Sequence, residues 1–351
     1  MADVSNKALI FNSVPTGEPT TQNLVLRSGT IAPVAPAGGL FVKILYVSFD
    51  PYLRGRMRPA AVKSYNQAFE LGKPMSNFGI ARVVVSDSPL YKQGDLVRSP
   101  LTQFAEYQAV TQPQLAYYEK IDNKDNFPLT YYIGVLGMPG ATAYYSFYNI
   151  GGPFKKGETI LVTAASGAVG QLVAQLARLE GLRVVGCVGS DAKVKYLIDE
   201  LKFDDAWNYN AEKDPYAAMK KHIPEGIDIY FDNVGGEITD AAFASANNFA
   251  RFIACGSISQ YNVLPGQGYG MKNTGQIVAK RIKWQGFIIV DHMSDKLLMQ
   301  EFNDKVSSLL RTGKFIFKED VTVGIDNVFA GFMSLFKGLN SGKASIKIAD
   351  E

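Results

Sequence analysis

Cysteine and histidine are scarce in this sequence, whose 351 residues include only two of each. Cys187 and Cys255 are 68 positions apart (255 − 187), with no partner at metal-ligand spacing. A structural zinc site usually takes four Cys or His ligands, and a catalytic one takes three protein ligands. The sequence therefore predicts no metal, no disulfide-stapled secreted fold and no Cys–His nucleophile. Both cysteines lie in apolar runs, which favours buried, inert thiols.

An excess of charge and long apolar runs are also missing. The net charge is +3, from 36 basic and 33 acidic residues, and Lys155-Lys156 and Lys220-Lys221 are isolated pairs. We therefore expect neither nucleic acid nor a membrane as a partner. No apolar run approaches the roughly 18 residues of a membrane helix. Neither end resembles a secretion or retention signal, so the expected location is the cytoplasm.

Length and the order of the apolar runs predict two domains of different kinds. At roughly 150 residues per domain, the chain is long enough for two. The first third consists of short β-branched or aromatic runs separated by Gly, Pro and Asp, which favours a small β-rich, barrel-like domain. Its predicted strands are Lys7–Phe11, Leu40–Phe49, Phe78–Ser86 and Phe104–Val110. The tail after about Phe315 could return to this domain.

From about Thr130 onward, strand-like and helix-like segments alternate. This alternation predicts an α/β domain with a parallel, doubly wound sheet and right-handed crossovers. The predicted strands are Thr159–Thr163, Arg183–Val188, Ile227–Asp232, Ala250–Cys255 and Arg281–Val290. The predicted helices are Ala168–Leu179, Ala192–Leu201 and Glu237–Ser245.

A glycine-containing loop joins the first of these strands to the first helix. Its sequence, Ala164-Ala165-Ser166-Gly167-Ala168-Val169-Gly170, is an A-x-G-x-x-G variant of the dinucleotide fingerprint. Gly167 would let the backbone approach a pyrophosphate, and Gly170 would permit close helix–strand packing. The helix N-terminus would favour the anion. A plain structural loop is the alternative, and the context favours dinucleotide binding.

The end of the second strand distinguishes between the two nicotinamide dinucleotides. An NAD site places an acid about 20 residues beyond the loop, to hold a ribose hydroxyl. Gly189 stands at that position, and Lys193 follows closely. A missing acid with a nearby cation favours a ribose phosphate, and hence NADPH. In the alternative interpretation, Asp191 is a helix N-cap and Lys193 is a solvated surface charge.

Several ordered motifs together resemble a known family. They are Gly137-Met138-Pro139-Gly140-x-Thr142-Ala143-Tyr144, the Ala165–Gly170 loop, Val188-Gly189-Ser190-Asp191-x-Lys193, Phe231-Asp232-Asn233-Val234-Gly235-Gly236-Glu237 and Cys255-Gly256-Ser257-Ile258-Ser259-x-Tyr261-Asn262. With Asp50-Pro51-Tyr52-x-Arg54-x-Arg56-Met57, they resemble the zinc-independent medium-chain dehydrogenase/reductases. Within these, the similarity is to the leukotriene-dehydrogenase, prostaglandin-reductase and plant alkenal double-bond reductase group. The similarity spans nearly the whole chain.

The resemblance implies a fold, a reaction and an assembly. It implies a GroES-like catalytic domain over 1–129 and 315–351, and a Rossmann NADP-binding domain over 130–314. It implies NADPH-dependent reduction of the carbon–carbon double bond of α,β-unsaturated aldehydes and ketones. It also implies a homodimer, with a small-molecule α,β-unsaturated carbonyl compound as the substrate.

The resemblance also implies a set of cofactor-binding residues. Gly167, Ala168 and Val169 would hold the pyrophosphate, and Ser166 in the same loop is also a cofactor-binding residue. Lys193 and Tyr209 would hold the ribose phosphate, with Gly189 as a further cofactor-binding residue. Asn233, Cys255, Ser257 and Tyr261 would line the cofactor, Phe287-Ile288-Ile289 would lie beside the nicotinamide, and Asn340 would close over it.

Two tyrosines are the candidates for catalysis. Hydride attack at the β-carbon of a conjugated carbonyl moves negative charge to the oxygen, where a neutral phenol can donate a hydrogen bond. Tyr261 is the first candidate, through the oxyanion or the nicotinamide ribose, and Tyr52 is the second, as a carbonyl-orienting donor. Ordinary packing is the alternative for both. Arg54 and Arg56 are expected to be scaffold charges, and His222 to be solvated.

Three other functions remain as alternatives. A quinone oxidoreductase would share the fold and the loop. A non-enzymatic NADPH-binding protein would use the Rossmann domain for sensing or assembly, which the tyrosine motif argues against. A zinc alcohol dehydrogenase is disfavoured by the small number of Cys and His ligands.

Overall fold

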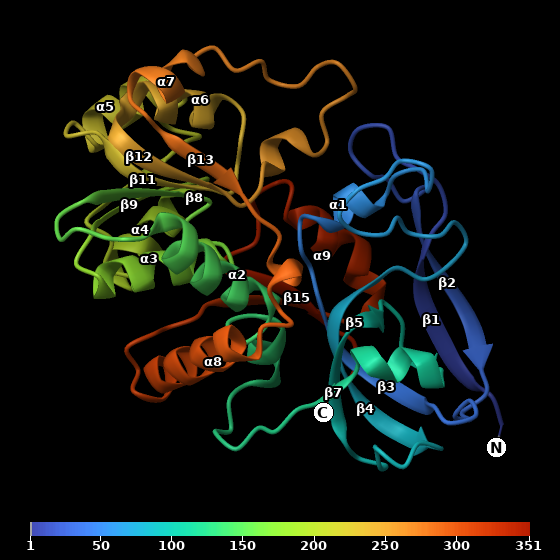
Figure 1. Cartoon of the computed structure of the whole chain (residues 1–351). Helices are drawn as coiled ribbons and strands as arrows, with labels where there is room; N and C mark the ends of the chain where they lie inside the picture. The colour runs from blue at the N-terminus through green and yellow to red at the C-terminus, as the bar shows by residue number, and fades with distance from the viewer. Residues whose placement is uncertain (1) are drawn as a thin grey trace. The chain divides into compact units, whose positions relative to one another are not determined.

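The computed structural model describes residues 2–351, which form two compact units. The β-rich unit runs to Gly137 and includes Glu319–Glu351, and the α/β unit is Met138–Lys318 (Figure 1). The domain boundaries suggested by the sequence, at 129/130 and 314/315, stay a prediction. Among residues 2–351, none of the helices has the length and apolar character needed to cross a membrane.

The β-rich unit contains a two-stranded and a seven-stranded sheet. In the first, β1 (Val4–Phe11) pairs antiparallel with β2 (Leu24–Ile31). The second has the order β14-β15-β3-β4-β5-β7, with β6 on β3. Its strands are β3 (Leu40–Ser48), β4 (Ser76–Ser86), β5 (Leu96–Gln103), β6 (Tyr107–Val110), β7 (Glu119–Lys120), β14 (Glu319–Val323) and β15 (Lys343–Lys347).

The C-terminal segment completes this unit. Strand β15 pairs antiparallel with β3, so that Ser345 lies opposite Ser48. The short helices are α1 (Leu53–Arg56) and α9 (Val328–Ser334). The ring of Phe49 stacks 5.7 Å from that of Phe104 and lies 6.1 Å from that of Phe332 on α9. The tail therefore contributes both a strand and core aromatic contacts.

The α/β unit contains a six-stranded parallel sheet with the order β10-β9-β8-β11-β12-β13. Its strands are β8 (Thr159–Thr163), β9 (Arg183–Val188), β10 (Asp205–Asn208), β11 (Ile227–Asp232), β12 (Ala246–Ala254) and β13 (Lys283–Gly286). Counted from β8, this is the order 3-2-1-4-5-6 of the Rossmann fold. The strand order reverses between β8 and β11, and ligands of such sheets bind at the carboxyl ends beside that point.

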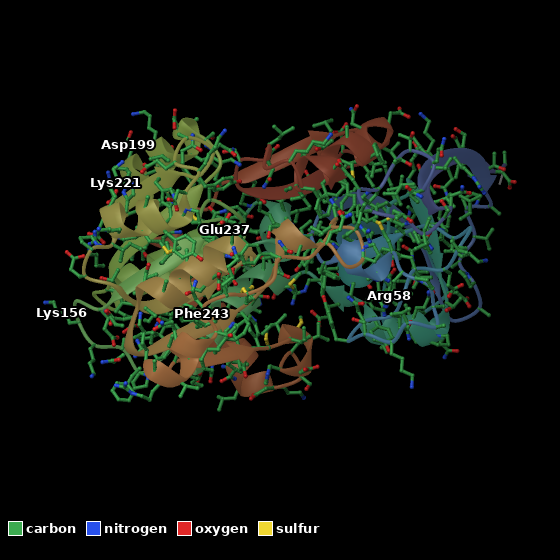
Figure 2. The ribbon with its side chains drawn as sticks, turned by 90° about the horizontal axis from the view of Figure 1, so that it is seen from above. Arg58, Lys156, Asp199, Lys221, Glu237 and Phe243 are labelled. Carbon is green, nitrogen blue, oxygen red and sulfur yellow. The ribbon has the colours of Figure 1, made fainter. Side chains whose placement is uncertain are left out.

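Helices cover both faces of this sheet. Figure 1 shows α5, α6 and α7 on one face and α2, α3 and α4 on the other. Their bounds, with α8, are α2 (Met138–Ser146), α3 (Gly170–Leu179), α4 (Asp191–Asp199), α5 (Pro215–His222), α6 (Glu237–Ser245), α7 (Gly275–Ala279) and α8 (Lys296–Arg311). Helix α3 buries Leu172, Val173 and Leu176, apolar residues at helical spacing. Phe243 of α6 lies among the side chains within the unit and is fully buried (Figure 2).

The sequence-based elements of this unit agree with the structure in most places. Strands β8, β9 and β11 and helix α6 have the predicted bounds. The predicted strand Arg281–Val290 is wrong in length, because β13 ends at Gly286 and Ile289–Asp291 form a 3₁₀ turn. In that turn the backbone N–H of Asp291 bonds to Ile288 O instead of to a neighbouring strand. Strand β10 and helices α2, α7 and α8 were not predicted.

Candidate active site

Most of the predicted cofactor residues follow the strands of the parallel sheet. Because all six strands run in one direction, their carboxyl ends lie along one edge. The residues at this edge are Ser166, Gly167, Ala168 and Val169 after β8, Gly189 and Lys193 after β9, Tyr209 after β10, Asn233 after β11, Cys255, Ser257 and Tyr261 after β12, and Phe287, Ile288 and Ile289 after β13. The fold therefore gathers positions that are more than 120 residues apart in the chain.

The loop after β8 is a tight turn into α3. Ala164 has a φ of 47°, and the N–H of Gly167 donates to Ala164 O at 2.9 Å. A Cβ on Gly170 would lie 2.7 Å from Ala164 O and 2.8 Å from Ala165 Cα, so only glycine fits there. The predicted role of Gly170 in close packing is confirmed. The first turn of α3 directs backbone N–H groups toward the loop, which suits an anion.

The ends of β9 and β10 lie against each other. A Cβ on Gly189 would lie 2.6 Å from the Tyr209 hydroxyl oxygen, so the tyrosine packs where any other residue would have a side chain. Asn210 Nδ2 donates to Gly189 O at 2.8 Å and so ties the two loops together. Gly189, in place of an acid, is therefore needed for the position of Tyr209.

The interpretation of Asp191 as a helix N-cap is wrong. Ser190 has the extended backbone of an N-cap, and its side chain accepts from the N–H of Lys193. Asp191 is the first helical residue, and its Oδ1 accepts from Asn208 Nδ2 at 2.8 Å. The Asp191 carboxylate is therefore hydrogen-bonded to Asn208, the last residue of the neighbouring strand β10. Lys193 lies half-buried in the first turn of α4.

Asn233 lies where the strand order reverses. Its backbone N–H donates to Thr163 Oγ1 at 2.9 Å, and its Nδ2 donates to Thr163 O at 2.7 Å. Its own carbonyl accepts from the N–H of Ile258 at 3.2 Å. Asn233 thus joins the carboxyl ends of β8, β11 and β12 within one small region.

The Tyr261 hydroxyl lies over the turn that follows β12. Its oxygen accepts from the N–H of Ser257 at 3.3 Å, and a Cβ on Gly256 would lie 3.2 Å from it. Burial raises the pKa of Tyr261, so the phenol stays protonated at neutral pH. The contact with Ser257 uses the oxygen and leaves the hydroxyl proton for another acceptor.

Asp232 shapes this region, although no role was predicted for it beyond its place in the motif. The residue is 4% exposed, and its Oδ1 accepts from the N–H groups of Val234 and Gly235 at 3.0 and 2.8 Å. Its Oδ2 accepts from Thr239 Oγ1 at 2.6 Å. Burial raises the pKa of Asp232, and these hydrogen bonds oppose the rise. A carboxyl followed by Asn-Val-Gly-Gly is the local signal that could have identified this turn.

The segment after β13 packs against α2. The Phe287 ring centre lies 5.8 Å from that of Tyr145, and the His292 ring stacks on Tyr145 at 4.0 Å. Ile289 is buried, whereas Val290 is 59% exposed. The aromatic contacts fix the backbone of Phe287–Ile289 beside the sheet edge.

The remaining predicted residues, Tyr52 and Asn340, belong to the β-rich unit. The Tyr52 hydroxyl donates to Asn77 Oδ1, and burial raises the pKa of Tyr52 far above its ordinary value. Asn340 Nδ2 donates to Gly342 O at 2.8 Å, in the turn before β15. Lys343, which the sequence analysis missed, is 1% exposed and pairs with Asp50 at 3.1 Å.

Arg54 and Arg56 bind backbone carbonyls of their own unit. Arg54 Nη2 donates to Gly17 O at 2.7 Å, and Arg56 Nη1 donates to Ser76 O at 2.8 Å. The Arg56 guanidinium also lies 4.0 Å over the Phe69 ring. These contacts agree with a scaffold role for both arginines, which stays a prediction.

The prediction that His222 is solvated is wrong. The residue is 9% exposed, with Nδ1 2.9 Å from Asp205 Oδ2 and Nε2 3.0 Å from Glu212 Oε1. Its ring stacks on Trp207. The preceding Lys221 is 64% exposed and lies at the surface (Figure 2). Carboxylates from β10 and the loop that follows it lie on both sides of the histidine ring. The polar residues next to His222 in the sequence did not indicate this burial.

Potential metal ligands do not cluster among residues 2–351, where no group of three or more His, Cys, Asp or Glu could hold an ion. Burial raises the pKa of both Cys187 and Cys255 to about 12. Both thiols are therefore protonated at neutral pH and poorly nucleophilic.

Comparisons with known proteins agree with this geometry. Residues 7–117 match a family model described as the N-terminal domain of oxidoreductase, and residues 168–304 match one described as zinc-binding dehydrogenase. The chain is 41% identical to a 2-alkenal reductase (NADP(+)-dependent) of Nicotiana tabacum, over 99% of each chain. It is 38% identical to the (+)-pulegone reductase of Mentha piperita, over 99% of this chain and 100% of that one.

A solved structure is similar over the same length. The crystal structure of CurA in complex with NADPH from Vibrio vulnificus superposes with a TM-score of 0.88 at 33% identity. The match covers 98% of this chain and 100% of that chain.

Proposed function

The chain belongs to the zinc-independent medium-chain dehydrogenase/reductases, in the alkenal double-bond reductase group, and on that premise we propose that it reduces the carbon–carbon double bond of α,β-unsaturated aldehydes and ketones with NADPH. The observation that carries the proposal is the carboxyl edge of the sheet. There a turn that requires glycine and the N-terminus of α3 follow β8, and Lys193 follows the adjacent strand β9. These groups fit the pyrophosphate and the ribose phosphate of NADPH.

The cofactor contacts follow from the order of the strands. The backbone at Ser166, Gly167, Ala168 and Val169 would bind the pyrophosphate, and Gly189, Lys193 and Tyr209 would surround the ribose phosphate. Asn233, Cys255, Ser257 and Tyr261 would line the nicotinamide end beside Phe287, Ile288 and Ile289. NADPH supplies the hydride when bound, and the residues of the chain orient it and exclude water.

Stabilisation of the developing oxyanion is the main task left to the side chains. Hydride addition at the β-carbon moves charge to the carbonyl oxygen, and the α-carbon then takes a proton. A neutral phenol can donate to that oxygen without a metal. Tyr261 suits the task because its proton is not used by the Ser257 contact. Tyr52 is the second candidate, but in this arrangement its single proton is donated to Asn77 Oδ1 and is not available to a carbonyl oxygen, so Tyr261 is the better donor.

The test of the function is a turnover assay with the purified full chain. A straight-chain 2-alkenal, a cyclic enone and a quinone are supplied separately with NADPH or NADH, and the loss of absorbance of the reduced nicotinamide is followed. We expect turnover of the enal and enone, with NADPH preferred to NADH. Turnover of the quinone alone would favour a quinone oxidoreductase, and no turnover of any substrate would favour a non-enzymatic NADPH-binding protein.

We also propose that the chain assembles as a homodimer through β13. This strand is at the edge of the sheet, and among residues 2–351 no strand pairs with its outer side. Trp284 on β13 is 43% exposed. An open edge with an exposed aromatic residue is a template for pairing with a second copy. Light scattering should give twice the mass of the 38.4 kDa chain, and a monomeric mass would contradict the proposal.

A further inference from the structure

The Asp232 carboxylate is buried at the end of β11 and accepts four hydrogen bonds. Its Oδ1 accepts from the N–H groups of Val234 and Gly235 at 3.0 and 2.8 Å, and from the Tyr230 hydroxyl at 3.2 Å. Its Oδ2 accepts from Thr239 Oγ1 at 2.6 Å. A carboxylate can only accept, so these four donors determine its orientation. The side chain therefore fixes the backbone of the turn that follows β11.

This turn holds the segment that carries Tyr261. Val234 O accepts from both the N–H and the hydroxyl of Ser259, at 3.1 and 2.7 Å. A Cβ on Gly235, whose φ is 71°, would lie 2.5 Å from Ser257 Cβ, so the two turns are in direct contact. The segment therefore rests on the two residues whose N–H groups the buried carboxylate binds.

The Tyr261 hydroxyl depends on the position of this segment. Its oxygen accepts from the Ser257 N–H at 3.3 Å, and the backbone N–H of Tyr261 donates to Ile258 O at 3.3 Å. A phenol has one proton, and the contact with Ser257 leaves that proton for a carbonyl oxygen. A displacement of the segment would therefore move the proposed oxyanion donor.

Other site residues near this point have anchors of their own. Asn233 donates from its N–H and its Nδ2 to Thr163, at 2.9 and 2.7 Å. The Cys255 N–H donates to the backbone carbonyl of Asp232 at 2.9 Å, a contact that any residue at this position retains. Loss of the Asp232 side chain should therefore displace the Tyr261 segment more than it displaces Asn233 or Cys255.

We propose that Asp232 is a positioning residue that holds the Tyr261 hydroxyl in place for the reaction, through the turn after β11. The proposal rests on the proposed function, because Tyr261 is its first candidate for the oxyanion donor. Asp232 itself touches no substrate in this scheme. Its task is to accept hydrogen bonds from the turn, and the task does not need its charge.

A double-mutant cycle tests the proposal. Asp232→Ala, Tyr261→Phe and the double variant are assayed with a straight-chain 2-alkenal at saturating NADPH. We expect each single change to lower kcat at least about fivefold. The double variant should fall no more than about twofold below Tyr261→Phe, because Asp232 acts through the hydroxyl that is already lost. The dissociation constant for NADPH, from fluorescence titration, should stay within about threefold in all three variants.

Asp232→Asn separates the acceptance of hydrogen bonds from the charge. The amide oxygen can accept from the N–H groups of Val234 and Gly235, and the amide nitrogen can donate to Thr239 Oγ1. This variant should therefore keep kcat within about threefold of wild type. A loss as large as that of Asp232→Ala would show that the charge is required, and would overturn the proposal.

Amide hydrogen exchange of the purified full chain gives a measurement independent of turnover. In Asp232→Ala, peptides that cover residues 255–261 should exchange at least about tenfold faster, because the turn that binds them is loosened. Peptides that cover β8 should exchange at the wild-type rate. Asp232→Asn should leave both groups of peptides unchanged.

Asp228→Ala is the matched control. Asp228 is on the same strand, and its Oδ2 accepts from the Thr159 N–H at 2.8 Å, but it lies at the amino end of β11. This change should leave kcat and the NADPH dissociation constant within about twofold of wild type. Where Asp232→Ala fails to fold, Gly235→Ala takes its place, since its Cβ would displace Ser257 while the carboxylate remains.

The outcomes separate this proposal from the proposed function. Multiplicative losses in the double variant would overturn the positioning role, as would unchanged kcat or unchanged exchange at residues 255–261 in Asp232→Ala. A wild-type chain that turns over no enal would instead overturn the proposed function, and the positioning role with it.

Discussion

The two units of this chain hold their proposed site residues in different ways. In the α/β unit each residue lies just after a strand, and the backbone makes most of the contacts, as in the Gly167–Ala164 turn. In the β-rich unit, Tyr52 depends on a buried side-chain network that includes Lys343, whose Nζ reaches Asp50 from 293 positions away. The proposed site residues of the α/β unit are therefore held by loops at the strand ends, and Tyr52 of the β-rich unit is held by a network that contains buried charges.

This difference has an energetic consequence. A loop at the end of a strand can lose one side-chain contact while the sheet beneath it keeps its ladder of hydrogen bonds. A buried ion pair that loses one partner leaves the other charge uncompensated in the core. We therefore expect changes in the β-rich network to affect folding most, and changes at the sheet edge to affect cofactor affinity and turnover.

The largest effect is expected for Asp50→Asn. The change leaves the Lys343 ammonium buried without its counter-charge, which costs about 3–5 kcal/mol in the free energy of unfolding. Removing both charges, in Asp50→Asn with Lys343→Met, should recover most of that loss. Urea unfolding monitored by circular dichroism measures both variants. A double variant as unstable as the single one would show that the ion pair is not the source of the effect.

The next effect is expected at the sheet edge, for Lys193→Ala. A hydrogen bond to a charged group contributes about 1.5–3 kcal/mol, so affinity for NADPH should fall by roughly 10- to 100-fold. Affinity for NADH, which lacks the ribose phosphate, should change little. Fluorescence titration of both dinucleotides measures the two constants.

The control for this variant is on the same helix. Lys195 is 80% exposed and pairs with Asp199 on α4, so Lys195→Ala removes a cation without removing Lys193. It should leave both affinities near their original values. Equal losses for NADPH and NADH in Lys193→Ala would show that Lys193 does not contact the phosphate.

The contrast between the units also explains what the sequence could predict. The loop after β8 was predictable because Gly167 and Gly170 are needed within a few residues of the strand that ends before them. The burial of Lys343 was not predictable, since its carboxylate partner, Asp50, lies on a segment distant in sequence. The prediction that His222 is solvated was wrong for the same reason, because its partners Asp205 and Glu212 lie on another strand and loop.

A smaller effect is expected for Tyr261→Phe. Loss of the hydroxyl removes the proposed oxyanion donor, so enone turnover should fall at least several-fold while affinity for NADPH stays nearly intact. Steady-state kinetics and a binding titration separate the two quantities. Tyr117→Phe, at a residue 57% exposed on the β-rich unit, is the control and should change neither. Unchanged turnover in Tyr261→Phe would remove this residue from the mechanism.

The smallest effect is expected at the opposite end of the parallel sheet. Glu158, next to the start of β8, accepts from Arg251 Nη1 at 3.1 Å and Nη2 at 2.8 Å. Burial raises the pKa of Glu158. The hydrogen bonds from the Arg251 guanidinium and the Lys155 N–H lower this pKa by more than burial raises it, so the pKa of Glu158 lies below its ordinary value. A carboxyl with a depressed pKa stabilises the fold above its unfolded pKa, and this stabilisation is lost as the pH falls through the folded value.

Glu158→Gln should therefore lower the free energy of unfolding by about 1 kcal/mol at pH 7. The difference from wild type should shrink as the pH falls below about 4.5, where the wild-type carboxyl also becomes neutral. Urea unfolding at a series of pH values measures it. Because Glu158 lies at the amino end of the strands, affinity for NADPH should not change. A loss of that affinity would show that the two ends of the sheet are coupled, and that cofactor binding depends on more than the loops at the carboxyl edge.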